Sequence, residues 1–152
     1  MPNHCHNRVT IYGSGHDTDD TRAQIAKIKA IFNDESIFNH FIPEPNWATI
    51  PNKDGELPTQ PSDDNRYHMP FFKSTGQQDA RWYDWRLQHW DTKWDAYDVE
   101  VTDGDDIDGF EVEFNTAWSP PEAVCHAMRE LYPNLSVSWF YDEPGMEIAG
   151  YL

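Results

Sequence analysis

The amino-acid sequence predicts an α+β fold, in which one antiparallel sheet carries helices on a single face and leaves its other face open. The first observation is that alternating apolar and polar segments, typical of half-buried strands, occur near both ends and in the middle of the chain. The second is that segments with helical spacing lie between them. With a long inserted excursion set aside, the order is β-α-β-β-α-β plus a last strand, the split β-α-β arrangement. A length of 152 residues fits one such domain, residues 1–152.

The first strand is predicted at residues 5–12, and the first helix follows it through about residue 33. In the strand, Cys5 and Val9 belong to the apolar side of the alternation, and polar residues occupy the other side. Asp17 or Thr18 is expected to cap the helix, because short oxygen-bearing side chains accept from its first free N–H groups. The apolar residues at helical spacing are Ile25, Ile28, Ile31 and Phe32.

Residues 34–80 are predicted to form the excursion, inserted after the first helix. Six prolines interrupt them, so no long regular element fits. A connection this long in a compact domain usually has a function of its own or is a flap. Its aromatic residues indicate that parts of it pack down. A second helix is then predicted over residues 79–90, where Trp82, Trp85 and His89 recur at helical spacing.

The C-terminal part reads as a hairpin, a helix and two strands. Residues 97–101 and 110–114 alternate as hairpin partners around a turn rich in Asp and Gly. Ser119-Pro120-Pro121-Glu122 has the pattern of a capping box with proline at the first helical position, which predicts a helix over residues 120–131. Strands are expected at residues 135–141 and 147–151.

The charge is strongly negative and unevenly placed. Lys and Arg number 11 and Asp and Glu 27, for a formal net charge of −16. Residues 94–152 hold 14 of the acids and a single base, Arg129. This balance argues against direct binding of nucleic acid and against docking on anionic lipid. No apolar run is long enough for a membrane span and no secretion signal pattern occurs, so a cytoplasmic protein is expected.

No cofactor or metal is predicted. Two cysteines, Cys5 and Cys125, form no disulfide framework and fit a reducing compartment, although a single bridge between them stays open at this stage. His4 and His6 point away from Cys5 on a strand, so the three cannot share one ion. The acidic turn fails the calcium-loop template. Its carboxylates remain candidates for contact with a basic partner: Asp103, Asp105, Asp106 and Asp108.

No catalytic residue is predicted. Ser119 is better explained as a helix cap than as a nucleophile, because no Gly-x-Ser-x-Gly surrounds it. No glycine-rich phosphate loop occurs. Carboxylate pairs are so common here that none can be assigned as acid and base. The sequence therefore favours a protein that is not an enzyme.

One constellation of aromatic and charged residues stands out in the middle of the chain: Trp90, Lys93, Trp94, Asp95 and Trp118. Lys93 is an isolated cation among indoles. We favour a structural interpretation, in which cation–π contacts and a salt bridge hold the second helix to the sheet. The alternative is an aromatic binding pocket with Lys93 as an anion contact.

Four segments together resemble a known family: MPNHCHN at 1–7, HWDTKWDAYD at 89–98, FNTAWSPP at 114–121 and YDEPGMEIAGYL at 141–152. They are similar to the YubB-like, ferredoxin-like domain family, encoded mainly by phages and plasmids. Two positions depart from it, since His4 stands where relatives often carry Trp and Asp91 where they often carry Gly. The resemblance implies a ferredoxin-like fold and a mobile-element origin, and it implies no activity.

These observations lead to two hypotheses of different kinds. The first is a non-enzymatic interaction protein of a phage or other mobile element, which binds a basic surface of a host protein in the cytoplasm; a nucleic-acid mimic or inhibitor is a specific version of it. The second is a small-molecule-binding protein or enzyme that uses the Trp/Lys93 constellation under residues 34–80. Self-association through the open sheet face or an edge strand is a third possibility for partners.

Overall fold

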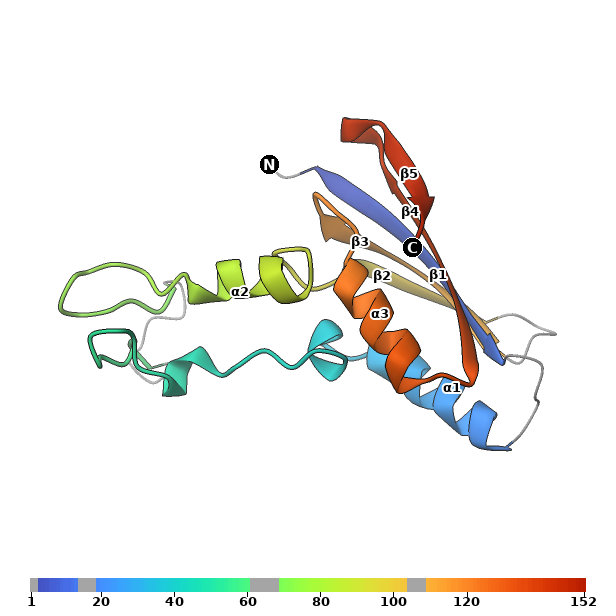
Figure 1. The fold of residues 1–152 in the computed structure, drawn as a ribbon, viewed down its shortest axis with the longest axis horizontal. Coiled ribbons are helices and arrows are strands. Elements are labelled where there is room, and N and C mark those ends of the chain that lie inside the picture. Colours follow the sequence, from blue (N-terminus) through green and yellow to red (C-terminus); the bar gives the residue numbers. More distant parts are fainter. Residues whose placement is uncertain (1–2, 14–18, 61–68, 104–108) are drawn as a thin grey trace.

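The protein forms a five-stranded antiparallel sheet in a computed structural model, which describes residues 3–13, 19–60, 69–103 and 109–152 (Figure 1). The strand order across the sheet is β2-β3-β1-β4-β5. The strands are β1 (His4–Gly13), β2 (Tyr97–Asp103), β3 (Gly109–Ala117), β4 (Leu135–Glu143) and β5 (Ile148–Tyr151). The helices are α1 (Asp19–Phe32), α2 (Arg81–His89) and α3 (Glu122–Leu131). Figure 1 shows α1 and α3 side by side on one face of the sheet. The predicted α+β fold is confirmed.

The alternation in β1 separates the two faces of the sheet. Cys5, Val9 and Ile11 are fully buried, while His6 and Arg8 on the opposite face are exposed. The neighbouring strands continue these rows, because a residue pairs across antiparallel strands with residues of the same face. Val9, for example, lies between Val112 of β3 and Trp139 of β4. One face of the sheet therefore forms the floor of the hydrophobic core.

Aromatic rings fill the space between this floor and the helices. Phe114 of β3 is at the centre, with ring centroids 5.8 Å from Phe32 of α1 and 5.6 Å from Trp139 of β4. Phe38 lies 6.1 Å from Phe114 and comes from the first turn of the excursion, the short 3₁₀ helix η1 (Phe38–His40). The expectation that parts of residues 34–80 pack down is thus confirmed for this turn and for the buried Phe41.

A polar side chain sits in the middle of this apolar layer. Asn7 is fully buried on the core side of β1. Its Nδ2 donates to the Cys5 carbonyl (3.1 Å) and to Thr116 Oγ1 (3.0 Å), and its Oδ1 accepts from Trp139 Nε1 (3.0 Å). Thr116 Oγ1 in turn donates to the Ser119 carbonyl at 2.7 Å. These bonds join three strands and the start of the α3 region, and they give both polar atoms of the Asn7 side chain a partner.

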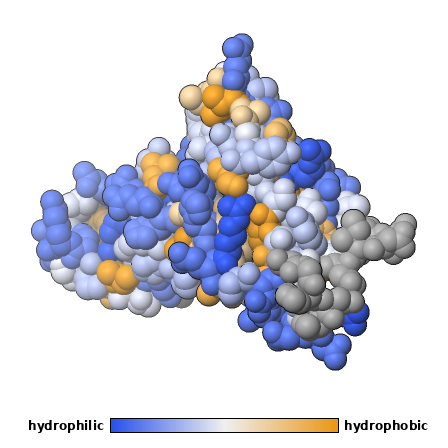
Figure 2. Space-filling model, turned by 45° about the vertical axis from the view of Figure 1, so that its right-hand side comes forward, coloured by the Kyte–Doolittle hydropathy of each residue, from blue (hydrophilic) through white to orange (hydrophobic). Residues whose placement is uncertain are grey.

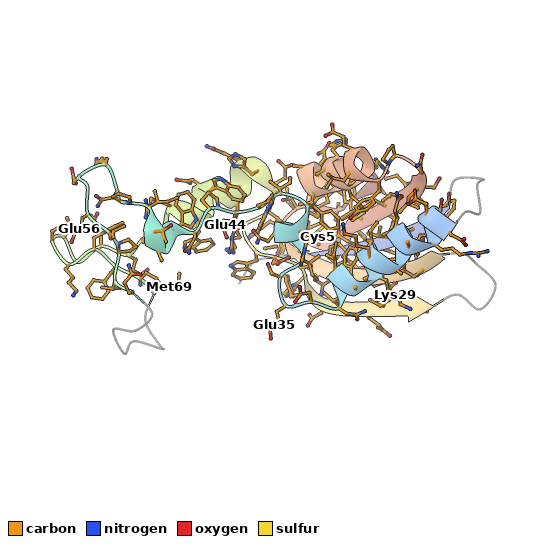
Figure 3. The ribbon with its side chains drawn as sticks, turned by 90° about the horizontal axis from the view of Figure 1, so that it is seen from below. Cys5, Lys29, Glu35, Glu44, Glu56 and Met69 are labelled. Carbon is orange, nitrogen blue, oxygen red and sulfur yellow. The ribbon has the colours of Figure 1, made fainter. Side chains whose placement is uncertain are left out.

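The excursion leaves the sheet and returns as an arm, which we define as residues 42–60 and 69–90. Figures 1 and 3 both show its two halves running side by side away from the sheet, with α2 in the returning half. The space-filling view in Figure 2 shows a mostly hydrophilic surface on this side of the molecule, with a few apolar patches. In Figure 3, Glu44, Met69 and Glu56 lie along the arm, apart from Cys5 in the sheet body. The helix predicted at residues 79–90 is confirmed, but it belongs to the arm rather than to the layer that covers the sheet. Its C-terminal half reaches the core through Trp85, which is partly buried against it, and the buried Trp90 follows directly after the helix.

The capping box predicted at Ser119 is wrong. Helix α3 begins at Glu122, and no side chain of its own segment caps it. The Ser119 hydroxyl instead donates to the Asp91 carbonyl at 2.5 Å. The cap comes from that same distant residue, because Asp91 Oδ2 accepts from the backbone N–H of Ala123 at 2.9 Å. A carboxylate at this end also faces the positive pole of the helix.

Asp91 combines this cap with a left-handed backbone, at φ 64°. We expect Asp91→Ala to lower the free energy of unfolding by about 2 kcal/mol, since it removes the cap and keeps a Cβ in the left-handed region. Asp91→Gly also removes the cap, but glycine adopts the left-handed backbone without strain. The free energy of unfolding should therefore fall by only about 1 kcal/mol or less. Urea denaturation of both variants measures the difference, and equal losses would contradict this account of the position.

Candidate functional site

The open face of the sheet, opposite α1 and α3, carries carboxylates from three strands. Glu113 of β3 pairs with Arg8 on one side and with Glu100 of β2 on the other. Glu111 stands two residues further along β3, on the same face. Asp142 of β4 pairs with His6 of β1. Asp98 of β2 is the fifth carboxylate of this face, where it accepts from Asn115 Nδ2 at 3.3 Å.

The bases on this face are few and lie along its middle strand. The Arg8 guanidinium is 5.4 Å from the centroid of Phe140, whose ring is 5.3 Å from that of Tyr151. His6 Nε2 is 3.7 Å from Glu113 Oε1. Tyr151 is 72% exposed, so an aromatic edge borders the carboxylates. Among the described residues, the open face thus carries five carboxylates together with Arg8 and the exposed His4 and His6 of β1, next to accessible aromatic rings.

The acidic turn predicted as a contact site lies almost wholly outside the described residues. Asp103 ends β2, and the other three members follow it: Asp105, Asp106 and Asp108. Their binding role stays a prediction. The described acids of the C-terminal part also include Glu122 and Glu130 on α3, across the sheet from the open face. The described acids of the C-terminal part therefore lie on both sides of the sheet, with five of them on the open face.

The structure divides the predicted constellation between two settings. Trp90 is 2% exposed, and its Nε1 donates to the Ile42 carbonyl at 3.0 Å. Asp95 accepts from the backbone N–H groups of Ile37 (2.9 Å) and Phe38 (3.1 Å), so it holds the turn where the excursion leaves α1. Both residues attach the base of the arm to the sheet body, and neither lies open to a ligand.

The remaining three members of the constellation are more accessible. Lys93 Nζ lies 4.6 Å from the ring centroid of Trp94, which is the expected cation–π contact. No carboxylate of the described residues forms the expected salt bridge with Lys93. Trp118 is 45% exposed with φ 70°, and its backbone N–H donates to the Asn3 carbonyl at 2.9 Å. Trp94, 37% exposed, lies beside a pocket that Trp118 does not line.

The cation that holds α2 in place is Arg86. Its guanidinium lies over the rings of Trp82 (5.2 Å) and Trp90 (4.9 Å). It also makes a bidentate pair with Glu44, from Nη2 to Oε1 at 2.9 Å and from Nε to Oε2 at 3.0 Å. We call these four residues the Arg86 cluster. The sequence analysis missed it, although the four-residue spacing of Trp82, Arg86 and Trp90 on one helix face was a usable signal.

A second arginine organises the outer half of the arm. Arg81 makes a bidentate pair with Asp79 (2.8 and 2.9 Å) and lies over the rings of Trp47 (5.0 Å) and Phe72 (5.6 Å). Its Nη2 donates to the carbonyls of Trp47 (3.1 Å) and Ile50 (2.8 Å). The hydrogen bonds from Arg81 hold the pKa of the Asp79 carboxyl below its ordinary value. We call these residues the Arg81 cluster.

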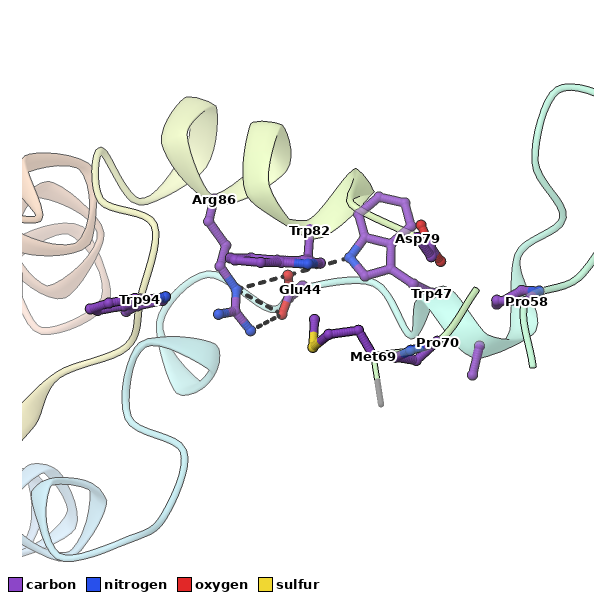
Figure 4. A pocket seen from close by; sticks show the side chains of 10 residues that line it. Glu44, Trp47, Pro58, Met69, Pro70, Asp79, Trp82, Arg86 and Trp94 are labelled. Carbon is purple, nitrogen blue, oxygen red and sulfur yellow. Dashed lines mark hydrogen bonds and ion pairs between the residues drawn. The ribbon is translucent and has the colours of Figure 1, made fainter. Parts of the chain in front are cut away.

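A pocket of about 430 Å³ lies between the two clusters (Figure 4). Its walls come from both halves of the arm and from the segment after α2, and its apolar lining consists mainly of Trp47, Pro58, Met69, Pro70, Trp82 and Trp94. Figure 4 shows Met69 and Pro70 across from the two indoles of Trp47 and Trp82. Of the predicted binding residues, only Trp94 lines this pocket, and Lys93 does not.

The cysteines show no sign of reactivity. Cys5 and Cys125 are both free and buried, and burial raises the pKa of each thiol to about 11. The bridge that the sequence left open is therefore not formed. In the ranges that the structure describes, no three His, Cys, Asp or Glu side chains are arranged to hold a metal ion. Nor does any described helix have the length and apolar character to cross a membrane.

Comparison with known proteins concerns the C-terminal part of the chain. Residues 88–152 match the model of a family described as the ferredoxin-like domain in Api92-like protein. No curated protein and no solved structure matches the chain. The matched range begins at the end of α2 and contains β2, β3, α3, β4 and β5. This similarity agrees with the antiparallel sheet described above, and it identifies the region from residue 88 onward as similar to a ferredoxin-like domain.

Proposed function

We propose that this protein is a non-enzymatic interaction protein whose open sheet face binds a basic surface of another protein. The supporting observation is the row of carboxylates that the strand register brings together on that face: Asp98, Glu100, Glu111, Glu113 and Asp142. Their sequence positions lie on three strands, so only the folded sheet makes them neighbours. The complementary partner surface is rich in Lys and Arg.

The aromatic border of the face suits the same partner. Phe140 already receives the Arg8 guanidinium at 5.4 Å, and the exposed Tyr151 ring extends that surface. An arriving guanidinium can stack on these rings while it pairs with Glu113 or Asp142, which combines a cation–π contact with an ion pair. The net charge of −16 steers such a partner from a distance.

The nucleic-acid mimic is the specific form of this proposal. Glu111 and Glu113 are two residues apart on β3, a separation of about 7 Å along a strand. Glu100 and Asp98 form a second row on the neighbouring strand β2. Regular rows of anions are what a nucleic-acid-binding protein meets on its usual ligand. The resemblance to the YubB-like family supports a phage or plasmid origin, so the proposed partner is a nucleic-acid-binding protein of the host cytoplasm.

The test compares two variants that lose the same charge. The open-face variant is Glu100→Gln/Glu111→Gln/Glu113→Gln. The control is Glu35→Gln/Asp54→Asn/Glu130→Gln, whose three acids are exposed and lie after α1, on the arm and on α3. With a nona-arginine peptide at low salt, we expect about tenfold weaker binding for the open-face variant, at ~0.5 kcal/mol for each surface charge, and no more than about a twofold loss for the control.

Equal losses in the two variants would show that the peptide responds only to net charge, and the proposed face would be abandoned. Light scattering of both variants accompanies the titration, because self-association through the open face or the β5 edge would occupy the same surface. A monomer–dimer change limited to the open-face variant would replace the host partner with a second copy of this chain.

A further inference from the structure

We propose that the arm pocket is a binding site for a small, planar, uncharged aromatic molecule. The inference is independent of the open face, since the pocket lies in the arm between the Arg86 and Arg81 clusters. Its volume of about 430 Å³ falls within the range of small-molecule sites. It also differs from the anion site considered from the sequence, because Lys93 is not part of its lining.

The shape and chemistry of the walls favour a flat apolar ligand. Three indoles line the pocket, and Figure 4 shows Met69 and Pro70 facing two of them across the hollow. Flat rings stack on indole and proline faces, and the thioether of Met69 adapts to an aromatic edge. An aliphatic chain would contact the same walls with less of its surface. The lining therefore selects a planar ring system.

The charged groups of the lining are already paired, which argues for a neutral ligand. Each oxygen of Glu44 accepts a hydrogen bond from Arg86, and Glu44 Oε2 also accepts from Trp47 Nε1 at 3.3 Å. Both oxygens of Asp79 accept from Arg81. A charged ligand would have to compete with these bidentate pairs, whereas a neutral ring leaves them intact. The net charge of −16 further disfavours an anion.

The walls are also held in place before any ligand arrives. Trp82 lies against the Arg86 guanidinium, and Trp47 lies against that of Arg81. The Glu44 side chain is 14% exposed and that of Asp79 only 4%, so both ion pairs are largely shielded from water. Preformed walls lower the ordering cost of binding. A bound ring would contact both halves of the arm and so stabilise their pairing.

The test uses three naphthalene probes that share a ring and differ in charge: neutral 2-naphthalenemethanol, anionic 2-naphthoate and cationic 2-naphthylmethylammonium. Isothermal titration calorimetry of the full chain should give a dissociation constant below about 1 mM for the neutral probe. The two charged probes should bind at least about tenfold more weakly, because neither meets an unpaired opposite charge in the lining.

Two variants locate the site. Trp94→Ala removes an exposed side chain of the pocket wall. It should weaken binding of the neutral probe about tenfold, because one aromatic stacking contact is lost. Trp118→Ala is the matched control, a second exposed tryptophan that lies outside the lining, and should leave binding unchanged. Ala48→Phe fills the pocket from its lining without removing a wall, and should abolish binding.

Equal affinity in Trp94→Ala and Trp118→Ala, or tightest binding of 2-naphthoate, would overturn the inference. Failure of the neutral probe to bind the wild-type chain would do so too. None of these results bears on the open-face variants, which leave every pocket residue unchanged, so the two proposals fail separately.

Discussion

Replacing Arg86 with alanine is expected to disorder the arm while the sheet stays folded. From α2, Arg86 contacts the outgoing half of the arm at Glu44 and the base of the arm at Trp90, whereas Arg81 contacts the outgoing half farther from the sheet. Its side chain is 25% exposed and that of Glu44 14% exposed. Removing it leaves a mostly buried carboxylate without its partner and two indoles without the cation between them.

The expected loss is about 3 kcal/mol in the free energy that keeps the arm closed, the lower end of what breaking a buried ion pair costs. Hydrogen exchange followed by mass spectrometry measures it locally, as faster exchange in residues 42–60 and 69–90 with unchanged protection in β1 and β3. Lys93→Ala is the matched control. Its cation–π contact with one exposed ring should be worth less than about 1 kcal/mol.

The variant Arg86→Lys distinguishes the effect of the positive charge from the effect of the planar guanidinium. Lysine keeps the charge but cannot make the bidentate pair with Glu44 while lying flat on two rings, so it should restore less than half of the loss. If Lys93→Ala opened the arm as far as Arg86→Ala does, the structural role first assigned to Lys93 from the sequence would stand and the Arg86 cluster would be secondary.

The second large effect is expected at Asn7. Asn7→Asp keeps the size of the side chain and the acceptor for Trp139 Nε1, but it turns the donor that serves the Cys5 carbonyl and Thr116 into an acceptor. At pH 7 it places a carboxylate in the core against two other acceptors. We expect a loss of about 4 kcal/mol in the free energy of unfolding.

This loss should depend on pH in a defined direction. Burial and the facing acceptors raise the pKa of the introduced carboxyl in the folded state above its unfolded value of about 4. The variant is therefore closest to wild type below pH 4, where the carboxyl is protonated and can donate in both states. Relative to wild type it loses about 1.4 kcal/mol per pH unit as the pH rises from 4 towards the folded pKa.

Asn7→Ala is the control that carries no charge. It removes the hydrogen bonds that Trp139 Nε1 and Thr116 make with Asn7. The free energy of unfolding should therefore fall by about 3 kcal/mol at every pH. Urea denaturation of the three proteins between pH 4 and pH 8 gives both quantities. A pH-independent difference between Asn7→Asp and wild type would show that water reaches this site and that the buried network is less closed than its hydrogen bonds indicate.

The elements that the sequence predicted well depend on short-range patterns. The parity of Cys5 and Val9 already assigned the two faces of β1, and helical spacing located α1 and α2 within a few residues. Such patterns work because each residue's burial follows from its neighbours along one regular element. The same reasoning failed at Ser119, where a local capping rule competed with Asp91, a carboxylate that approaches from another segment.

The candidate site was predicted less well than the fold. Lys93 drew attention as an isolated cation, yet Arg86 makes the contacts that hold the arm, because guanidinium can lie flat on two rings and still pair with a carboxylate. Glu44 and Trp47 carried no signal at all, since residues 34–80 have no periodicity from which their neighbours can be inferred. The open-face carboxylates were visible as charge but not as a row.

By itself, the sequence determined the strand and helix order, the buried faces of β1, β3 and β4 and the net negative charge, because these follow from composition and from periodicity along the chain. The tertiary structure alone decided that Glu100 and Asp142 join Glu111 and Glu113 on one face, that Arg86 pairs with Glu44 across the arm, and that a pocket opens beside Trp94. Those features depend on contacts between segments far apart in the chain, and their spacing follows from packing rather than from any local pattern.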